Sequence, residues 1–186
     1  VKKIIKALRP PEKEIIPVIT PIDQEQVLAG KIALITGGSS GIGFAIANAF
    51  LNSGCKVIIA GTNEDKLQKA IKKLNGEVRS IPIDIKNVEA LPGKVEEAAG
   101  LFEEHKIDIL VNSAGTHHTL SFEEMNEEEF DKIMDTNVKG TFFMCQAMGK
   151  YMKDHGIKGH ILNLSSSSAL RPAWGPYQMS KWAIRG

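Results

Sequence analysis

The sequence predicts an α/β fold, a doubly wound parallel sheet with helices on both faces. From residue 30 onward, short apolar segments alternate with segments of helical periodicity, which is the order expected of strand–helix–strand units. The short segments are apolar at nearly every position, as strands are when both faces of a sheet are covered. Glycine and asparagine separate the two kinds of segment, at places where helices end or begin.

Five strands are expected, because each of five segments is a run of apolar residues bounded by polar residues or glycine. In chain order they cover residues 31–36, 55–61, 77–83, 107–112 and 159–165. Helices are expected between and after them, where apolar residues recur every three or four positions. They cover residues 44–54, 63–75, 87–105, 127–156 and 177–186.

Several helix ends carry capping signals. Gly54 suits the position just after a helix, and Asn63 suits an N-cap. Asn126 followed by Glu129 is the asparagine version of a capping box. These signals agree with the periodicity, so the helices are predicted from two independent patterns.

Composition limits the class of protein. The 186 residues suffice for one domain with a core, and the formal net charge of +1 gives no reason to expect a nucleic-acid partner. No apolar run reaches the length of a membrane span, and residues 1–17 lack the apolar core of a signal peptide. Cys55 and Cys145 lie in apolar stretches outside any C-x-x-C motif, which indicates buried thiols in a reducing, cytoplasmic compartment.

Residues 1–29 are interpreted as an N-terminal arm, with the domain at residues 30–186. Four prolines between positions 10 and 21 exclude a long helix and favour extended chain. The arm either lies over the domain or forms a loose tail. A basic amphipathic helix for a membrane surface at residues 1–9 is the weaker alternative, because the segment is so short.

The stretch TGGSSGIG, residues 36–43, lies between the first expected strand and the first helix. Glycines let backbone N–H groups approach a phosphate closely, and a helix N-terminus adds partial positive charge. The spacing G-x-x-x-G-x-G differs from the common G-x-G-x-x-G of dinucleotide-binding folds. By itself the loop is compatible with cofactor binding or with a turn required only for packing.

Three unusual stretches follow expected strands and therefore belong at one edge of the sheet. They are residues 36–43, NSAG at 112–115 and SSSS at 165–168. The last expected helix begins at Tyr177, and Lys181 lies one turn further on the same face. Because ligands of open parallel sheets bind outside the carboxyl ends of the strands, these stretches indicate a functional site.

Taken in order, these motifs resemble those of the classical short-chain dehydrogenase/reductase family, over residues 30–186. TGGSSGIG is similar to the family's T-G-x-x-x-G-x-G, and NSAG to its N-N-A-G, with Ser113 replacing the second asparagine. Asn137 in TNVKG matches the family's helix asparagine, and NLSS followed by YQMSK resembles its serine and Y-x-x-x-K pair. The resemblance implies a Rossmann fold and an oxidoreductase that acts on a secondary alcohol or ketone.

The resemblance also implies the roles of individual residues. Tyr177 is the general acid/base, and Lys181 stabilises its phenolate and binds the nicotinamide ribose. Asn137 holds a water of the proton relay, and Ser166 donates a hydrogen bond to the substrate oxygen. The cofactor is expected along Gly37, Ser39, Ser40, Gly41, Ile42, Gly43, Gly61, Thr62, Asp84, Ile85, Asn112, Ala114 and Gly115, with Tyr177 and Lys181.

Two local assignments stay open at this point. The connection between the last strand and the catalytic helix is shorter than is usual in the family, so Ser165 and Ser167 are weaker candidates beside Ser166. His117 and His118 follow NSAG, where they either contact substrate or are solvated loop residues. No metal site is expected, because no Cys, Asp or Glu stands at ligand spacing from them.

The choice between NADP and NAD depends on the end of the second strand. NAD-binding folds place a carboxylate there for the ribose 2′-OH, whereas Gly61 and Thr62 occupy this place here. Thr62 and Asn63 can donate to a 2′-phosphate, so NADP is slightly favoured. Ser40 argues the other way, since many NADP-using members carry a basic residue at that position. The two acidic residues after Asn63 are expected in the first turn of the next helix.

Family members usually continue beyond the Y-x-x-x-K helix, so the domain is expected to lack the last strands of the family fold. The resemblance further implies a dimer or tetramer paired through the helices around residues 137–151 and 177–186. The expected partners are a small alcohol or carbonyl substrate and copies of the same chain, with neither nucleic acid nor membrane. The alternative function is a catalytically silent nucleotide-binding or assembly module that keeps the fold.

Overall fold

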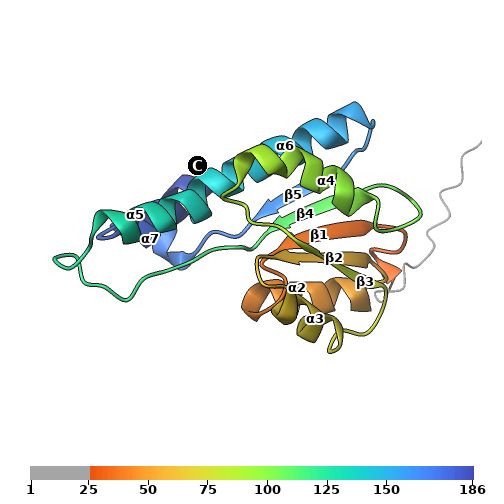
Figure 1. Cartoon of the computed structure of the whole chain (residues 1–186), viewed down its shortest axis with the longest axis horizontal. Helices are drawn as coiled ribbons and strands as arrows, with labels where there is room; N and C mark the ends of the chain where they lie inside the picture. Colours follow the sequence, from red (N-terminus) through yellow and green to blue (C-terminus); the bar gives the residue numbers. More distant parts are fainter. Residues whose placement is uncertain (1–25) are drawn as a thin grey trace, which may run out of the picture.

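The computed structural model describes residues 26–186, and at its centre is a five-stranded parallel sheet (Figure 1). The strands are β1 Ile32–Thr36, β2 Lys56–Gly61, β3 Val78–Pro82, β4 Ile109–Asn112 and β5 His160–Asn163. Their order across the sheet is β3-β2-β1-β4-β5, so the chain changes direction across the sheet at β1. The predicted doubly wound parallel sheet is confirmed. The predicted arm lies outside the described residues except for its last four.

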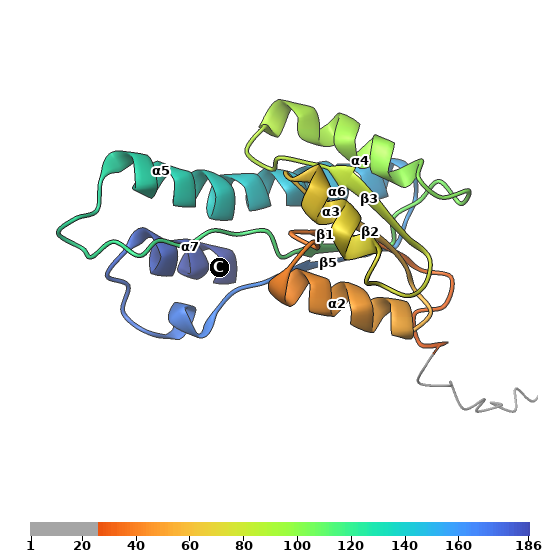
Figure 2. The same cartoon turned by 60° about the horizontal axis from the view of Figure 1, so that its bottom comes forward.

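Helices cover both faces of the sheet (Figures 1 and 2). On one face lie α2 Gly41–Asn52 and α3 Glu64–Ile71, and on the other lie α4 Leu91–Ala99 and α6 Thr141–Asp154. Beyond the carboxyl ends of the strands, α5 Glu127–Met134 and α7 Pro176–Arg185 lie side by side. The shorter elements are the 3₁₀-helices η2 Val88–Ala90 and η4 Ser167–Leu170 and the π-helix η3 Asp135–Gly140.

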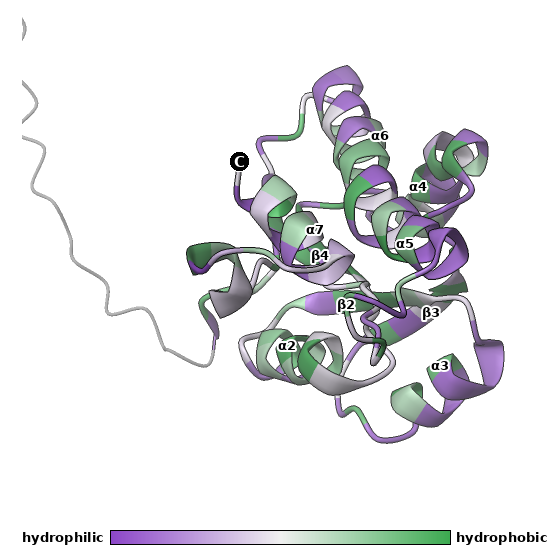
Figure 3. Ribbon diagram, turned by 90° about the vertical axis from the view of Figure 1, so that its left-hand side faces the viewer, coloured by the Kyte–Doolittle hydropathy of each residue, from purple (hydrophilic) through white to green (hydrophobic). Residues whose placement is uncertain are grey.

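Alternate residues of the central strands enter two separate cores. Ile32 and Leu34 of β1 pack with α4 and α6, whereas Ala33 and Ile35 pack with α2 and α3. Every residue of β1 and β4 is buried, as the apolar pattern predicted. β5 differs, since all four of its residues are exposed at the edge of the sheet. Hydrophilic residues make up much of α3 (Figure 3), which buries only two side chains, Leu67 and Ala70.

The boundaries of three predicted helices are corrected by the structure. The helix expected over 63–75 ends at Ile71, and the one expected over 87–105 ends at Ala99. The long helix expected over 127–156 runs as α5, η3 and α6, with the π-helix in its middle. There Gly140 packs so closely on Ile85 that a Cβ at position 140 would lie 2.9 Å from the Ile85 carbonyl oxygen.

The predicted helix caps are present. Asn63 Oδ1 accepts the backbone N–H of Lys66 at 2.8 Å, and Asn126 Oδ1 accepts that of Glu129 at 2.9 Å. The second cap is only half of a capping box, because the Glu129 carboxylate binds Lys132 Nζ at 2.8 Å instead of reaching back. These local bonds fix where α3 and α5 begin.

Both cysteines are free thiols, as expected, but they differ in burial. Burial raises the pKa of the Cys55 thiol to about 12. Cys145 is only half-buried, and desolvation also raises its pKa. Neither thiol is therefore in the ionised form that makes a cysteine reactive near neutral pH. Within residues 26–186, no helix has the length and hydropathy of a membrane span.

Asp108, at the amino end of β4, connects three strands. Its Oδ2 accepts the backbone N–H of Ile32 at 3.0 Å, and Lys106 Nζ lies 3.1 Å from the same oxygen. The backbone of Asp108 also bonds to Ile32 in β1 and His160 in β5. The Asp108 carboxylate is buried, whereas its lysine partners are partly exposed. Its main structural role is therefore to accept a hydrogen bond from the buried N–H of Ile32.

We expect Asp108→Ala to destabilise the fold by about 1–3 kcal/mol, because it leaves a buried N–H without an acceptor. Asp108→Asn keeps an acceptor oxygen and should cost less. Glu104→Gln is the control, since Glu104 bonds Lys56 at 2.8 Å on the surface, where solvent screens the ion pair and its loss should change stability little. Urea unfolding measures all three, and equal losses for Asp108→Ala and Glu104→Gln would contradict the expectation.

Candidate active site

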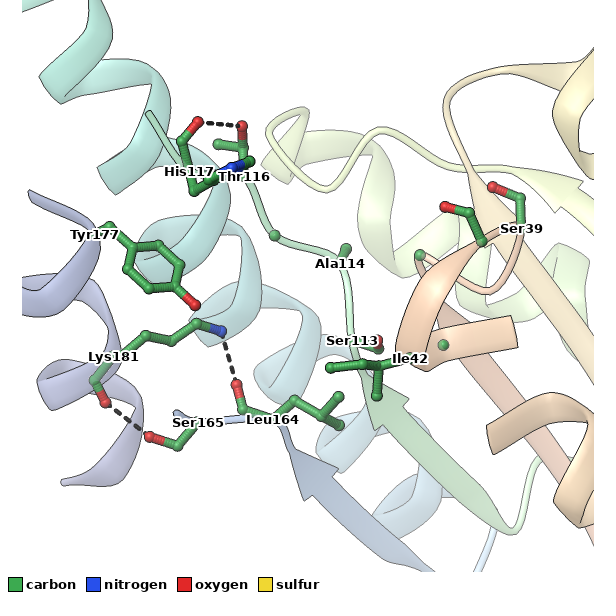
Figure 4. Close-up of a pocket in the computed structure, with 14 residues that line it drawn as sticks. Ser39, Ile42, Ser113, Ala114, Thr116, His117, Leu164, Ser165, Tyr177 and Lys181 are labelled. Carbon is green, nitrogen blue, oxygen red and sulfur yellow. Dashed lines mark hydrogen bonds between the residues drawn. The ribbon is translucent and has the colours of Figure 1, made fainter. Parts of the chain in front are cut away.

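A cavity of about 340 Å³ opens at the carboxyl ends of the strands, where the motifs were predicted to meet. It is lined by residues of four separate segments (Figure 4): Gly37, Ser39, Ser40, Ile42, Gly43, Ser113, Ala114, Gly115, Thr116, His117, Leu164, Ser165, Tyr177 and Lys181. The glycine loop after β1, the loop after β4, the end of β5 and the first turns of α7 therefore share one site.

The glycine loop is shaped by the direct approach of two backbones. A Cβ at Gly37 would lie 2.8 Å from the Cα of Ala114, and Gly37 also has a φ of +68°. A Cβ at Gly43 would overlap the carbonyl oxygen of Gly37. Thr36 Oγ1 completes the junction by accepting the backbone N–H groups of Ser113 and Ala114, each at 3.2 Å. Only glycines at positions 37 and 43 allow the loops after β1 and β4 to pack this closely.

The start of α2 is suited to an anion. Its N-cap, Ser40, makes no side-chain bond to the helix, and its first turn holds no acidic residue. The N–H groups of that turn thus keep their hydrogen-bonding capacity, and the helix dipole adds partial positive charge. A phosphate group bound along residues 37–43 fits this chemistry.

A second cavity, of about 610 Å³, continues from the glycine loop towards the ends of β2 and β3. It is lined by Thr36, Gly37, Ser39, Ser40, Gly61, Thr62, Asn63, Lys66, Ile83, Asp84, Ile85, Lys86, Ala114, Gly115, Thr116 and Thr136. The two cavities share Gly37, Ser39, Ser40, Ala114, Gly115 and Thr116. Together they form a continuous site on both sides of the loop, which fits an elongated dinucleotide.

Tyr177 and Lys181 project from α7 into the first cavity, and their polar ends point into the same space (Figure 4). Lys181 Nζ donates to the carbonyl oxygen of Leu164 at 2.8 Å and lies 5.9 Å from the centre of the Tyr177 ring. Burial lowers the pKa of Lys181. The lysine is therefore held in place by the residue that follows β5, while its charge is partly desolvated beside the phenol.

Asn137 lies in the π-helix η3, behind the cavity rather than on its lining. Its Oδ1 accepts the backbone N–H of Thr116 at 2.8 Å, and its Nδ2 donates to the Thr116 carbonyl at 2.9 Å and to Ser180 Oγ at 3.0 Å. The buried amide thus connects the loop after β4 to α7. Short π-helical turns often occur at functional sites. This one places Asn137 between two of the segments that line the cavity.

The three candidate serines lie in different surroundings. Ser165 lines the cavity, and its Oγ donates to the Lys181 carbonyl at 3.0 Å. Ser166 is the N-cap of η4, and its Oγ accepts the backbone N–H of Ser168 at 3.1 Å. Ser166 and Ser167 do not line either cavity. Of the three candidates, only Ser165 therefore lines the cavity that Tyr177 and Lys181 enter, one residue before the position favoured by the motif.

Most of the residues expected to bind the cofactor line the two cavities, and two do not. Gly41 lies outside both, and Asn112 is buried behind them. Asn112 Nδ2 donates to Asn163 Oδ1 at 2.9 Å and to Cys145 Sγ at 3.2 Å, which ties β4 to β5 and α6. Its place at the strand end is as predicted, but its side chain points into the sheet layer.

The structure also adds residues to the site. His117 lines the cavity, whereas His118 Nδ1 lies 2.9 Å from the Leu120 carbonyl oxygen. Lys66, Thr116 and Leu164 line the cavities although no motif marks them. The sequence marked Thr36 as the last residue of the first strand. Its hydrogen bonds to Ser113 and Ala114, however, depend on the position of the loop after β4. No cluster of three metal-ligating side chains occurs among residues 26–186.

Comparison with known proteins identifies a related family. The family model described as short chain dehydrogenase matches residues 31–186. A 3alpha-hydroxysteroid dehydrogenase of Mediterraneibacter gnavus is 36% identical over 171 residues, which are 86% of this chain and 66% of that protein. An uncharacterised oxidoreductase of Staphylococcus haemolyticus is 38% identical over 146 residues, 76% of this chain and 61% of its own length. The chain spans less than two thirds of the length of these relatives.

Solved structures agree in fold. A short-chain type dehydrogenase/reductase from Mycobacterium marinum superimposes with a TM-score of 0.77 at 35% identity, covering 84% of this chain and 66% of that one. A structure of actinorhodin polyketide ketoreductase with NADPH gives a TM-score of 0.76 at 27% identity, covering 83% and 60%. The likeness therefore includes the sheet, its flanking helices and most of the described chain.

We expect Gly43→Ala to destabilise the fold, by about 1–3 kcal/mol, because its Cβ meets the backbone of Gly37 rather than a side chain that can move. Gly149→Ala is the matched control. It also lies within a helix, but nothing stands within 4 Å of its Cβ, so alanine should stabilise α6 by about 0.5–1 kcal/mol. Opposite signs in urea unfolding are expected, and a stabilising Gly43→Ala would contradict the packing described.

Proposed function

Because this chain belongs to the short-chain dehydrogenase family, we propose that the whole protein is an oxidoreductase acting on a secondary alcohol or ketone with a nicotinamide cofactor. One observation carries the proposal. A phenol and an ammonium group, Tyr177 and Lys181, enter the cavity that the glycine loop and residues 113–117 also line. A silent nucleotide-binding module, the alternative, has no need to place this pair there.

The cofactor's place follows from the same residues. The start of α2 and the close-packed loop at Gly37 and Gly43 suit its pyrophosphate, and the cavity at Gly61, Thr62, Asp84 and Ile85 suits its adenosine half. When bound, the nicotinamide ring supplies the carbon that gives or accepts a hydride. NADP is favoured over NAD because no carboxylate stands at position 61, the last of β2, or at position 62.

In this proposal Tyr177 transfers the proton of the reacting oxygen, giving it in reduction and taking it in oxidation. A free tyrosine phenol ionises only near pH 10, so it needs a neighbouring positive charge to work near neutrality. Lys181 supplies that charge. The burial that lowers its pKa also keeps away the water that would screen it, so it acts more strongly than an exposed lysine.

The remaining groups orient this pair. Asn137 holds Thr116 and Ser180 together and so fixes α7 against the loop after β4, beside the water-relay role that the family resemblance implies for it. A serine hydroxyl after β5 donates to the substrate oxygen. Ser166 holds the motif position and Ser165 faces the cavity, so we propose that one of this pair is the donor.

Tyr177→Phe should lower turnover by about 10²–10⁴-fold, because it removes the proton-carrying oxygen and keeps the ring. Cofactor affinity should stay nearly unchanged. Tyr151→Phe is the control: the chain's other tyrosine is buried against α4, with its hydroxyl 3.2 Å from the His105 carbonyl, and it lines neither cavity. Steady-state kinetics of the full-length protein test this, and a Tyr177→Phe enzyme with more than about half of normal turnover would end the mechanism.

Two further comparisons belong to that experiment. Lys181→Met should lower turnover and weaken cofactor binding together, since it removes a charge and a ribose contact. Between Ser165→Ala and Ser166→Ala, the variant with the larger loss of turnover identifies the hydroxyl that meets the substrate.

We also propose that the whole protein is a dimer or tetramer paired through α6 and α7, as the family resemblance implies. Supporting this, Phe142 of α6 and Met179 and Trp182 of α7 expose large apolar side chains. Light scattering of the full-length protein should give at least twice the monomer mass, and Phe142→Asp should reduce it. A monomer mass for the unsubstituted protein would refute the assembly.

A further inference from the structure

We infer that Ser180, a position that the Y-x-x-x-K motif leaves open, is the positioning residue that sets the distance between Tyr177 and the loop after β4. The inference rests on the proposed function, because it assumes that Tyr177 exchanges a proton with a substrate in the first cavity. It goes beyond that function by assigning a role to a buried side chain that lines neither cavity.

The hydroxyl of Ser180 is fully buried and forms two hydrogen bonds. Its Oγ accepts a hydrogen bond from Asn137 Nδ2 at 3.0 Å and donates one to the backbone carbonyl of Tyr177 at 2.7 Å. A hydroxyl has one proton, so donation to the carbonyl leaves its oxygen to act as an acceptor. The direction of the hydrogen bonds from Asn137 to Tyr177 is thereby fixed, with the amide nitrogen facing α7.

Helix formation does not explain a serine at this position. Alanine is the better helix former, and a serine that bonds back to the carbonyl three or four residues before it slightly destabilises a helix. Burial does not explain it either, because a hydroxyl removed from water needs partners that an alanine does not. The partner that Ser180 gains outside its own helix is Asn137, in the π-helix η3. The contact between α7 and η3 is therefore the reason for the hydroxyl.

The hydrogen bonds from α7 to other segments are distributed unequally. Those on one side go to residues 164–171, after β5. They join Lys181 to Leu164 and Ser165, Trp182 to Arg171, and Arg185 to Ala169; Figure 4 shows the first two. Within residues 26–186, the bond between Asn137 and Ser180 is the one hydrogen bond from α7 to any segment before β5. Apolar packing on α5 and η3 also holds the helix, but such packing is not directional.

Ser180 thus completes a connection from the loop after β4 to the phenol. Asn137 bonds both the N–H and the carbonyl of Thr116, which lines the same cavity as Tyr177. Without the Ser180 hydroxyl, α7 stays bonded to the segment after β5, and Tyr177 and Lys181 move together. Their separation from residues 113–117 is then no longer fixed. A displacement of about 1 Å is enough to lower a rate about 10²-fold.

The kinetic test measures oxidation of cyclohexanol, menthol and borneol by the full-length protein with NADP and with NAD. Ser180→Ala should lower kcat about 10- to 100-fold, because the reacting groups are misplaced, and should leave cofactor affinity within about twofold. The pH at which turnover is half-maximal should not change, since Tyr177 keeps Lys181 beside it. A loss caused by partial unfolding would instead reduce the number of cofactor sites found by calorimetry.

Arg185→Met is the matched control, since it removes one hydrogen bond between α7 and the segment after β5, to the Ala169 carbonyl at 3.0 Å. It should change kcat less than about twofold. In an Asn137→Ala background, Ser180→Ala should cause no further loss of kcat, because both substitutions break the same bond. Independent roles would multiply the two losses.

Hydrogen exchange provides a readout that needs no substrate. Exchange of the backbone N–H groups of residues 177–185 should accelerate in Ser180→Ala and stay unchanged in β1 and β4. A kcat above about half of normal, losses that multiply with Asn137→Ala, or unchanged exchange in α7 would refute the role of Ser180 while the proposed function stands. If the unsubstituted protein binds neither cofactor, both proposals fall.

Discussion

The contact on which the whole site depends is the backbone-to-backbone junction between the loops after β1 and β4. Gly37 lies against Ala114 with no room for a side chain, and Thr36 Oγ1 bonds the N–H groups of residues 113 and 114. Adjacent parallel strands bring their carboxyl ends together, but only this junction holds the two loops at a fixed separation. From it follow the position of the start of α2, the continuity of the two cavities and the wall that faces Tyr177.

A second constraint places α7. The side-chain amide of Asn137 forms hydrogen bonds to both Thr116 and Ser180. The loop after β4 and the helix that carries Tyr177 are therefore bonded to the same buried group. Lys181 adds a bond to the end of β5 through the Leu164 carbonyl. Four segments distant in sequence thus converge through four hydrogen bonds. A buried polar network of this kind is costly when broken, which gives the site its defined geometry.

Electrostatics divide the site into two ends with different chemistry. At one end a partly desolvated ammonium group stands beside a phenol, where a proton can be exchanged. At the other end, the start of α2 and the exposed lysines Lys66, Lys69 and Lys73 offer positive charge, and none of these lysines forms a salt bridge within residues 26–186. An elongated anionic ligand that also carries a reactive ring would satisfy both ends at once, which is the physical sense in which the fold suits a dinucleotide.

The sequence by itself determined the order of strands and helices, the caps at Asn63 and Asn126 and the edge at which the motifs meet. These features are encoded locally, in periodicity, capping side chains and glycine spacing, so short stretches suffice to predict them. Only the tertiary structure decided that Ser165 faces the cavity, that Asn112 turns towards β5 and that Lys66 reaches the end of β2. The π-helix at Asn137 and the exposure of β5 were likewise decided only by the tertiary structure. Each of these features depends on which distant segment of the chain lies next to a side chain, and the residues adjacent to it in sequence do not determine that contact.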